Sequence, residues 1–195
     1  MISDARTLQI LAWPTDAEHW HVDPDTGRRC WAHPTARIAS TTSLGDQTII
    51  HAGAIIAGHV KLGPRCTLGE YARIGAHSTL TADVAVGEHV RLGPRCIIGE
   101  YASIGAHSVI AADVSIGAHS TLAEKVSIGR GAVIGYGCKL GRKSAVHAGG
   151  VLPERFELPE LYIFRTDLYM MAERGRVQIS GARPKYNLRK LAKTL

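Results

Sequence analysis

The sequence has no long apolar segment. Among its 195 residues, no apolar run approaches the ~18 residues that a membrane-spanning helix needs. The opening stretch MISDARTLQILAWP places the acidic Asp4 before any apolar run and holds no long hydrophobic core, so it does not fit a secretory signal. We therefore expect no membrane span and a cytoplasmic location.

Cysteines and aromatic residues are also few. The four cysteines show no zinc-finger spacing, and aromatic residues make up only 6% of the chain, so no platform for stacking bases is evident. The formal net charge is +6, and residues 151–195 hold nine Lys and Arg against five Asp and Glu. Such a tail suits nucleic acid, a membrane surface or an anionic cofactor. Because both nucleic-acid signals are missing, a solvated basic face is the simpler expectation and nucleic acid is not favoured as a partner.

A strict six-residue repeat dominates the chain. From Ile38 to Val146 every sixth residue is aliphatic, at nineteen positions, and a small or β-branched residue stands two places before each of them. A helix repeats near 3.6 residues and a strand at 2, so a strict hexad indicates a parallel β-helix. Three hexads would close one triangular turn of eighteen residues. We predict an all-β protein with about six such coils.

The segments on either side of the repeat are expected to cover its ends. We predict an N-terminal cap at 1–35, the β-helix at 36–150, and a C-terminal cap or tail at 151–195. The turn signals around Asp23 and Pro24 favour a strand and a hairpin over the open first coil. Pro153 and Pro159 are expected to end the repeat, and short strands and a terminal amphipathic helix are expected after them.

A longer repeat lies within the short one. Residues 61–90 match residues 91–120 at nineteen of thirty positions. Thirty residues are five hexads but not a whole number of turns, so we expect equivalent residues to lie on different faces. Cys66, Cys96 and Cys138 take the small inward position and no two of them are eighteen apart, which predicts buried, reduced thiols.

The hexads "IGAHS", "VSIG", "AVIG" and "CKLG" resemble those of the left-handed β-helix hexapeptide-transferase superfamily. The resemblance implies left-handed coils, a homotrimer with sites between subunits, and acyl transfer from acetyl-CoA or another acyl donor to a hydroxyl or amine of a small-molecule substrate. The superfamily also implies two alternatives. One is a non-catalytic trimeric structural or binding module for a protein partner, and the other is a zinc-dependent enzyme similar to γ-class carbonic anhydrases.

Wrapping the chain at eighteen residues stacks the corner residues into columns. His59 would lie over His77, and His89 over His107, ~5 Å apart. No metal is expected, since no two histidines in the array have the five-residue spacing that the resemblance to carbonic anhydrases requires. If a metal site does exist, its ligands would be His59 and His77 with His107 of a neighbour.

Acyl transfer needs a histidine base oriented by a carboxylate. We predict His77 with Asp113, or His119 with Asp83, within the chain or across a subunit interface. Two departures from the family weaken this enzyme hypothesis. No histidine falls two residues after an inward aliphatic, where the UDP-N-acetylglucosamine acyltransferase branch keeps its catalytic one, and the array has no extruded loop.

The cofactor and interface predictions rest on charge. Arg142, Lys143 and Lys185 are candidates to hold the phosphates of a CoA-type donor. One face carries small, nearly neutral outward residues and is the predicted trimer interface: Ile49, Thr67, Ala85, Ser103, Thr121 and Lys139. A second face, which bears Arg37, Arg73 and Arg91, suits solvent or an anion.

Overall fold

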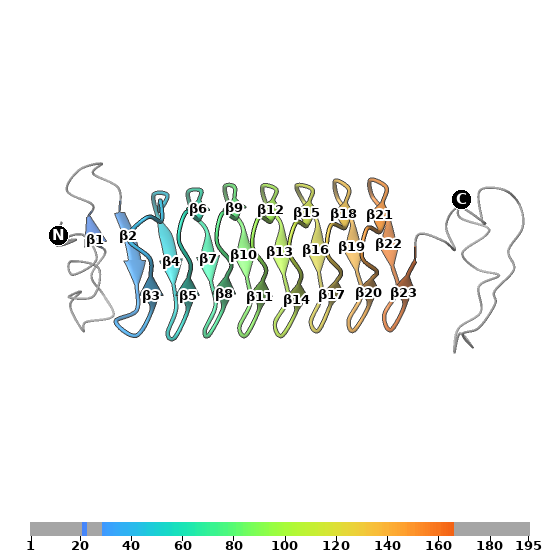
Figure 1. The fold of residues 1–195 in the computed structure, drawn as a ribbon, viewed down its shortest axis with the longest axis horizontal. Helices are drawn as coiled ribbons and strands as arrows, with labels where there is room; N and C mark the ends of the chain where they lie inside the picture. The colour runs from blue at the N-terminus through green and yellow to red at the C-terminus, as the bar shows by residue number, and fades with distance from the viewer. Residues whose placement is uncertain (1–20, 23–28, 166–195) are drawn as a thin grey trace, which may run out of the picture.

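The computed structural model describes residues 21–22 and 29–165, and these form strands joined by tight corners (Figure 1). The strands make three sheets. The first sheet contains β1 (His21–Val22), β2 (Arg29–Ala32), β4 (Thr48–Ile50), β7 (Thr67–Leu68), β10 (Ala85–Val86), β13 (Ser103–Ile104), β16 (Thr121–Leu122), β19 (Lys139–Leu140) and β22 (Glu157–Leu158). The second contains β3 (Arg37–Ile38), β5 (Ile55–Ile56), β8 (Arg73–Ile74), β11 (Arg91–Leu92), β14 (Val109–Ile110), β17 (Ser127–Ile128), β20 (Ala145–Val146) and β23 (Ile163–Phe164). The third contains β6 (Lys61–Leu62), β9 (Thr79–Leu80), β12 (Ile97–Ile98), β15 (Ser115–Ile116), β18 (Val133–Ile134) and β21 (Val151–Leu152).

Each turn of the stack pairs in parallel with the next, at an offset of eighteen residues. Val86 in β10, for example, pairs with Leu68 on one side and with Ile104 on the other. This arrangement is the predicted left-handed parallel β-helix. At the N-terminal end β1 pairs with β2 in antiparallel register, His21 opposite Cys30, and β2 continues in parallel onto β4. The two strands expected at this end therefore pair in the described residues, and their role as a cap stays a prediction.

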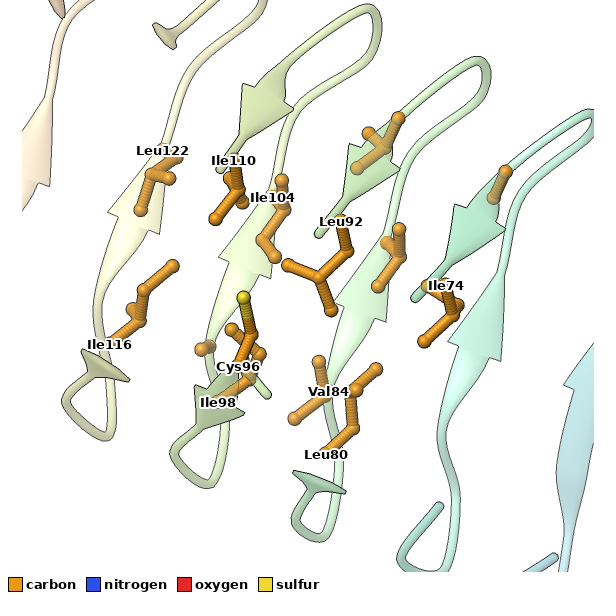
Figure 2. Packing of buried hydrophobic residues seen from close by; sticks show 14 of the residues in the cluster. Ile74, Leu80, Val84, Leu92, Cys96, Ile98, Ile104, Ile110, Ile116 and Leu122 are labelled. Carbon is orange, nitrogen blue, oxygen red and sulfur yellow. The ribbon is translucent and has the colours of Figure 1, made fainter. Parts of the chain in front are cut away.

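The hexad produces this fold because two of every six residues point inward. Figure 2 shows such pairs, with Cys96 beside Ile98 and aliphatic side chains stacked along the interior. Leu80, Ile98 and Leu68 are fully buried. Burial of an aliphatic side chain of this size contributes about 1.5–3 kcal/mol. The regular column of such residues is therefore the main source of the stack's stability.

The small inward position also accepts polar side chains, because the next turn supplies an acceptor. Ser78 Oγ donates to the carbonyl of Gly93 at 3.1 Å, and Cys66 Sγ donates to that of Thr81 at 2.9 Å, each fifteen residues further on. Burial raises the pKa of the Cys66, Cys96 and Cys138 thiols above their ordinary value. Cys66, Cys96 and Cys138 are buried and form no disulfide with a described residue, so the prediction of buried, reduced thiols is confirmed.

The stack is longer than predicted, with about eight turns rather than about six. Leu152, Leu158 and Phe164 continue the inward column beyond Gly150, so the expectation that Pro153 and Pro159 end the repeat was wrong. Each proline directly follows an inward residue and leads into a corner. Proline is a regular turn residue, so it is compatible with that place. The strands and helix expected after residue 165 lie outside the described residues.

In the part of the chain that the structure describes, no helix is long and apolar enough to cross a membrane.

Candidate functional site

The corners carry the polar side chains that the interior cannot hold. The second residue of most corners has a left-handed backbone, as at His77 (φ 60), His107 (φ 58) and Tyr101 (φ 57). In most of these corners the backbone N–H of this residue donates to a carbonyl in the turn before, as the N–H of His77 does to Gly58 at 3.1 Å. At His59 the N–H donates to Thr41 Oγ1 instead. This repeated geometry points successive side chains the same way and stacks them.

The stacked columns have the predicted composition. The rings of His59 and His77 have centroids 4.8 Å apart and planes 13° apart, and those of His89 and His107 are 5.1 Å and 6° apart. Tyr101 stacks on His119 with a centroid distance of 4.9 Å. The eighteen-residue wrapping was therefore sufficient to place these rings from the sequence.

The structure does not bring His77 and Asp113 together within the chain. Arg95 lies between them in the column, and its Nε donates to Asp113 Oδ1 at 2.6 Å. Arg130 Nε donates to the other oxygen at 2.9 Å. These two arginines hold the pKa of the Asp113 carboxyl below its ordinary value. Asp113 is thus engaged by cations rather than by a histidine.

His119 and Asp83 are separated in the same way, with Tyr101 in the turn between them. Arg65 binds Asp83 through two hydrogen bonds, of which Nε to Oδ1 measures 2.6 Å. The hydrogen bond from Arg65 lowers the pKa of this carboxyl too. A pairing of either histidine with a carboxylate of another subunit stays a prediction.

The geometry of the candidate metal ligands does not converge. An imidazole lone pair lies in the plane of its ring, and zinc needs Zn–N distances of about 2.0–2.1 Å. The nearly parallel planes of His59 and His77, 4.8 Å apart, direct their lone pairs side by side rather than at one point. His107 lies on another corner of the same chain, and a site completed by His107 of a neighbouring subunit stays a prediction. Within residues 21–22 and 29–165, no group of three His, Cys, Asp or Glu side chains could hold a metal ion.

The candidate donor-binding cations are only partly described. Arg142 Nη2 lies 3.1 Å from Glu124 Oε2, so its charge already has a partner. Lys143 follows it in the same exposed corner. Lys185 lies outside the described residues.

One cluster that the sequence analysis did not assemble lines an open depression where the second sheet meets its corner. We name it the arginine–histidine depression, and its lining residues are Tyr71, Arg73, His89, Arg91, His107 and Val109. His107 Nε2 lies 3.6 Å from Glu88 Oε1, so a histidine and a carboxylate are in contact at this depression. The corner columns could have predicted this contact. They place His89 one turn before His107, and Glu88 directly precedes His89 in the sequence.

The fold and the stacked corners define a hexapeptide-repeat β-helix protein. The family model described as the GMPPB C-terminal domain matches residues 27–160, and the chain belongs to that family. No curated protein matches the chain.

Several solved structures are similar in fold. The acetyltransferase domain of PglB from Neisseria gonorrhoeae is 23% identical, with a TM-score of 0.41, over 54% of this chain and 48% of that one. UDP-N-acetylglucosamine acyltransferase from Campylobacter jejuni is 16% identical, with a TM-score of 0.38, over 83% and 82%. A mutant of GDP-perosamine N-acetyl transferase from Caulobacter crescentus, in complex with CoA and GDP-perosamine, is 22% identical, with a TM-score of 0.35, over 69% and 51%. The chain thus spans about half the length of the first of these.

Proposed function

We propose that the chain transfers an acetyl or other acyl group from a CoA-type donor to a hydroxyl or amine, with His107 as the general base. The observation that carries the proposal is the contact between His107 Nε2 and Glu88 Oε1 at 3.6 Å. A histidine base needs a carboxylate to orient it, and such contacts are often loose before substrate binds. The solved structures of similar fold include acyltransferases and a complex with CoA, which supports this class of reaction.

The proposed step uses the free nitrogen of the ring. With Nε2–H directed at Glu88, Nδ1 of His107 accepts the proton of the acceptor hydroxyl or amine. The acceptor oxygen or nitrogen then bonds to the thioester carbonyl carbon, and the C–S bond breaks. The departing thiolate takes the proton back from His107 and leaves as the free thiol. Lys143 and Lys185 remain candidates for holding the donor's phosphates.

Transfer from acetyl-CoA to a panel of hydroxyl and amine acceptors tests the proposal. Because general-base catalysis contributes about 10²–10⁴-fold, His107→Ala should lower turnover at least a hundredfold. His59→Ala is the matched control, since His59 is also an exposed corner histidine stacked on another histidine but has no carboxylate contact in the described residues. Equal turnover in His107→Ala and wild type, or a large loss only in His77→Ala or His119→Ala, would reject His107 as the base.

A non-catalytic homotrimer is the second candidate, and the first sheet favours it. Its outward positions include Thr67, Ala85 and Ser103, which are small enough for flat packing. At the far end of this face Lys139 Nζ binds Glu157 Oε1 at 3.0 Å, so the face is close to neutral. Light scattering tests this assembly. Ala85→Arg should dissociate a trimer that uses this face, whereas an unchanged mass would exclude the face.

A further inference from the structure

The second sheet holds two arginines directly opposite each other. Arg73 in β8 and Arg91 in β11 are partners in the parallel ladder, and both side chains point outward and are exposed. Neighbouring strands lie about 4.8 Å apart. Like charges in directly opposite positions destabilise a sheet. The arginine pair therefore lowers the stability of the fold unless a negatively charged group neutralises it.

Elsewhere the chain neutralises its stacked arginines. Arg65 is bound by Asp83, and Arg95 and Arg130 share Asp113. By contrast, neither Arg73 nor Arg91 makes an ion pair or a side-chain hydrogen bond with a described residue.

The surroundings of the pair lack a carboxylate on the same face. The outward positions of the second sheet from β3 to β23 carry no acidic residue: Arg37, Ile55, Arg73, Arg91, Val109, Ser127, Ala145 and Ile163. Two glutamates, Glu70 and Glu88, lie at the adjoining corners, and the carboxylate of Glu88 contacts His107. The guanidinium groups of Arg73 and Arg91 therefore lie next to each other and line the depression without a carboxylate partner among the described residues.

We infer that the arginine–histidine depression binds a phosphate or pyrophosphate group of a small molecule. Two guanidinium forks one strand apart match the oxygens of such a dianion, and arginine binds phosphate in a bidentate manner. His89, which lines the same depression, presents a ring N–H donor. Tyr71 stacks on His89 at 5.1 Å and fixes the plane of that ring. The inference goes beyond acyl transfer and does not depend on it, because it requires only binding.

Isothermal titration of the full chain with inorganic pyrophosphate, in a buffer without phosphate, tests the site. Arg73→Gln and Arg91→Gln should each weaken binding at least tenfold, and Arg91→Lys should give an intermediate loss, because lysine keeps the charge but not the fork. Arg37→Gln is the matched control. Arg37 occupies the same outward position of the same sheet, but it lies opposite Ile55 rather than another arginine. Its removal should change affinity less than twofold.

A second readout separates binding from general attraction to a basic surface. Pyrophosphate should raise the melting temperature of wild type and of Arg37→Gln but not that of Arg73→Gln or Arg91→Gln. Competition with CoA identifies the source of the phosphate. Displacement by CoA would assign the site to the donor, and simultaneous binding would assign it to a separate phosphorylated ligand. No pyrophosphate binding by wild type at millimolar concentration, or an equal loss in Arg37→Gln, would overturn the inference.

Discussion

Residues 61–90 and residues 91–120 are two copies of one sequence, and each makes the same local contacts. Arg65 binds Asp83 in the first copy, as Arg95 binds Asp113 in the second. Tyr71 stacks on His89 at 5.1 Å, and the equivalent Tyr101 stacks on His119 at 4.9 Å. Contacts between residues eighteen apart within a copy were thus kept in both.

The two copies nevertheless face in different directions. Leu68 lies in β7 of the first sheet, whereas its equivalent Ile98 lies in β12 of the third. Contacts between a residue of the first copy and a residue of the second therefore occur only at the boundary between the copies and are not repeated within each copy. Arg73 and His89 belong to the first copy and Arg91 and His107 to the second, so the arginine–histidine depression lies at the seam between them. Contacts repeated in both copies stabilise the stack, whereas the residues proposed to bind phosphate lie at the seam.

The largest expected effects are in the core, where the two copies should be equivalent. Leu68→Ala and Ile98→Ala each remove a fully buried side chain from the interior column. Each should lower the free energy of unfolding by about 2–5 kcal/mol. Chemical denaturation followed by circular dichroism measures the loss. If one loss were more than twice the other, the interior would not be uniform along the stack and the comparison would break.

Intermediate effects are expected at the buried thiols. Cys66 and Cys96 are equivalent, and each donates to a carbonyl fifteen residues further on, at 2.9 and 3.1 Å. Serine takes the same position at Ser78 and makes the same type of bond. Because the acceptor is retained, Cys66→Ser and Cys96→Ser should each cost about 1 kcal/mol or less.

A thiol reagent provides a further check on the same residues. Both cysteines are buried, and burial raises the pKa of both thiols, which lowers the fraction of reactive thiolate. Neither should react in the folded protein at neutral pH, and both should react after unfolding. Rapid labelling of only one copy would show that the stack opens locally there.

The fold could be predicted from the sequence because the hexad directly encodes which side chains point inward. The same reasoning placed His59 over His77, since an eighteen-residue turn leaves no freedom in the register. The length of the stack was underestimated at Pro153 and Pro159. Proline commonly ends a repeat, but here it stands at a corner, where the turn accommodates it.

The candidate site was less accessible to sequence reasoning. The order of residues in each corner column correctly predicted which residues lie next to Asp113 and Asp83. It did not predict which of them each carboxylate binds. A long arginine side chain in the adjacent turn reaches each carboxylate, so Arg95 and Arg65 outcompete the histidines two turns away. The arginine–histidine depression combines a corner with a sheet face. It therefore appears only when columns and faces are considered together.

The smallest effects are expected at the exposed ion pairs, and here the copies should differ. Asp113 binds both Arg95 and Arg130, whereas Asp83 binds Arg65. Asp113→Asn should therefore destabilise the chain more than Asp83→Asn, with both losses well below those in the core. Urea denaturation at neutral pH compares the two variants.

The pH dependence of these losses follows from the lowered pKa of both carboxyls. Protons bind the unfolded chain first, near the ordinary aspartate pKa of about 3.9, so the stabilisation is complete above that pH and declines as pH falls toward the lower folded-state pKa. The difference between wild type and Asp113→Asn should accordingly be constant between pH 6 and 8 and shrink below about pH 4. High salt should also reduce it, since exposed charges are screened. A difference that persisted unchanged at low pH and in high salt would mean that Asp113 acts through packing, and the two copies would then differ in structure rather than in charge alone.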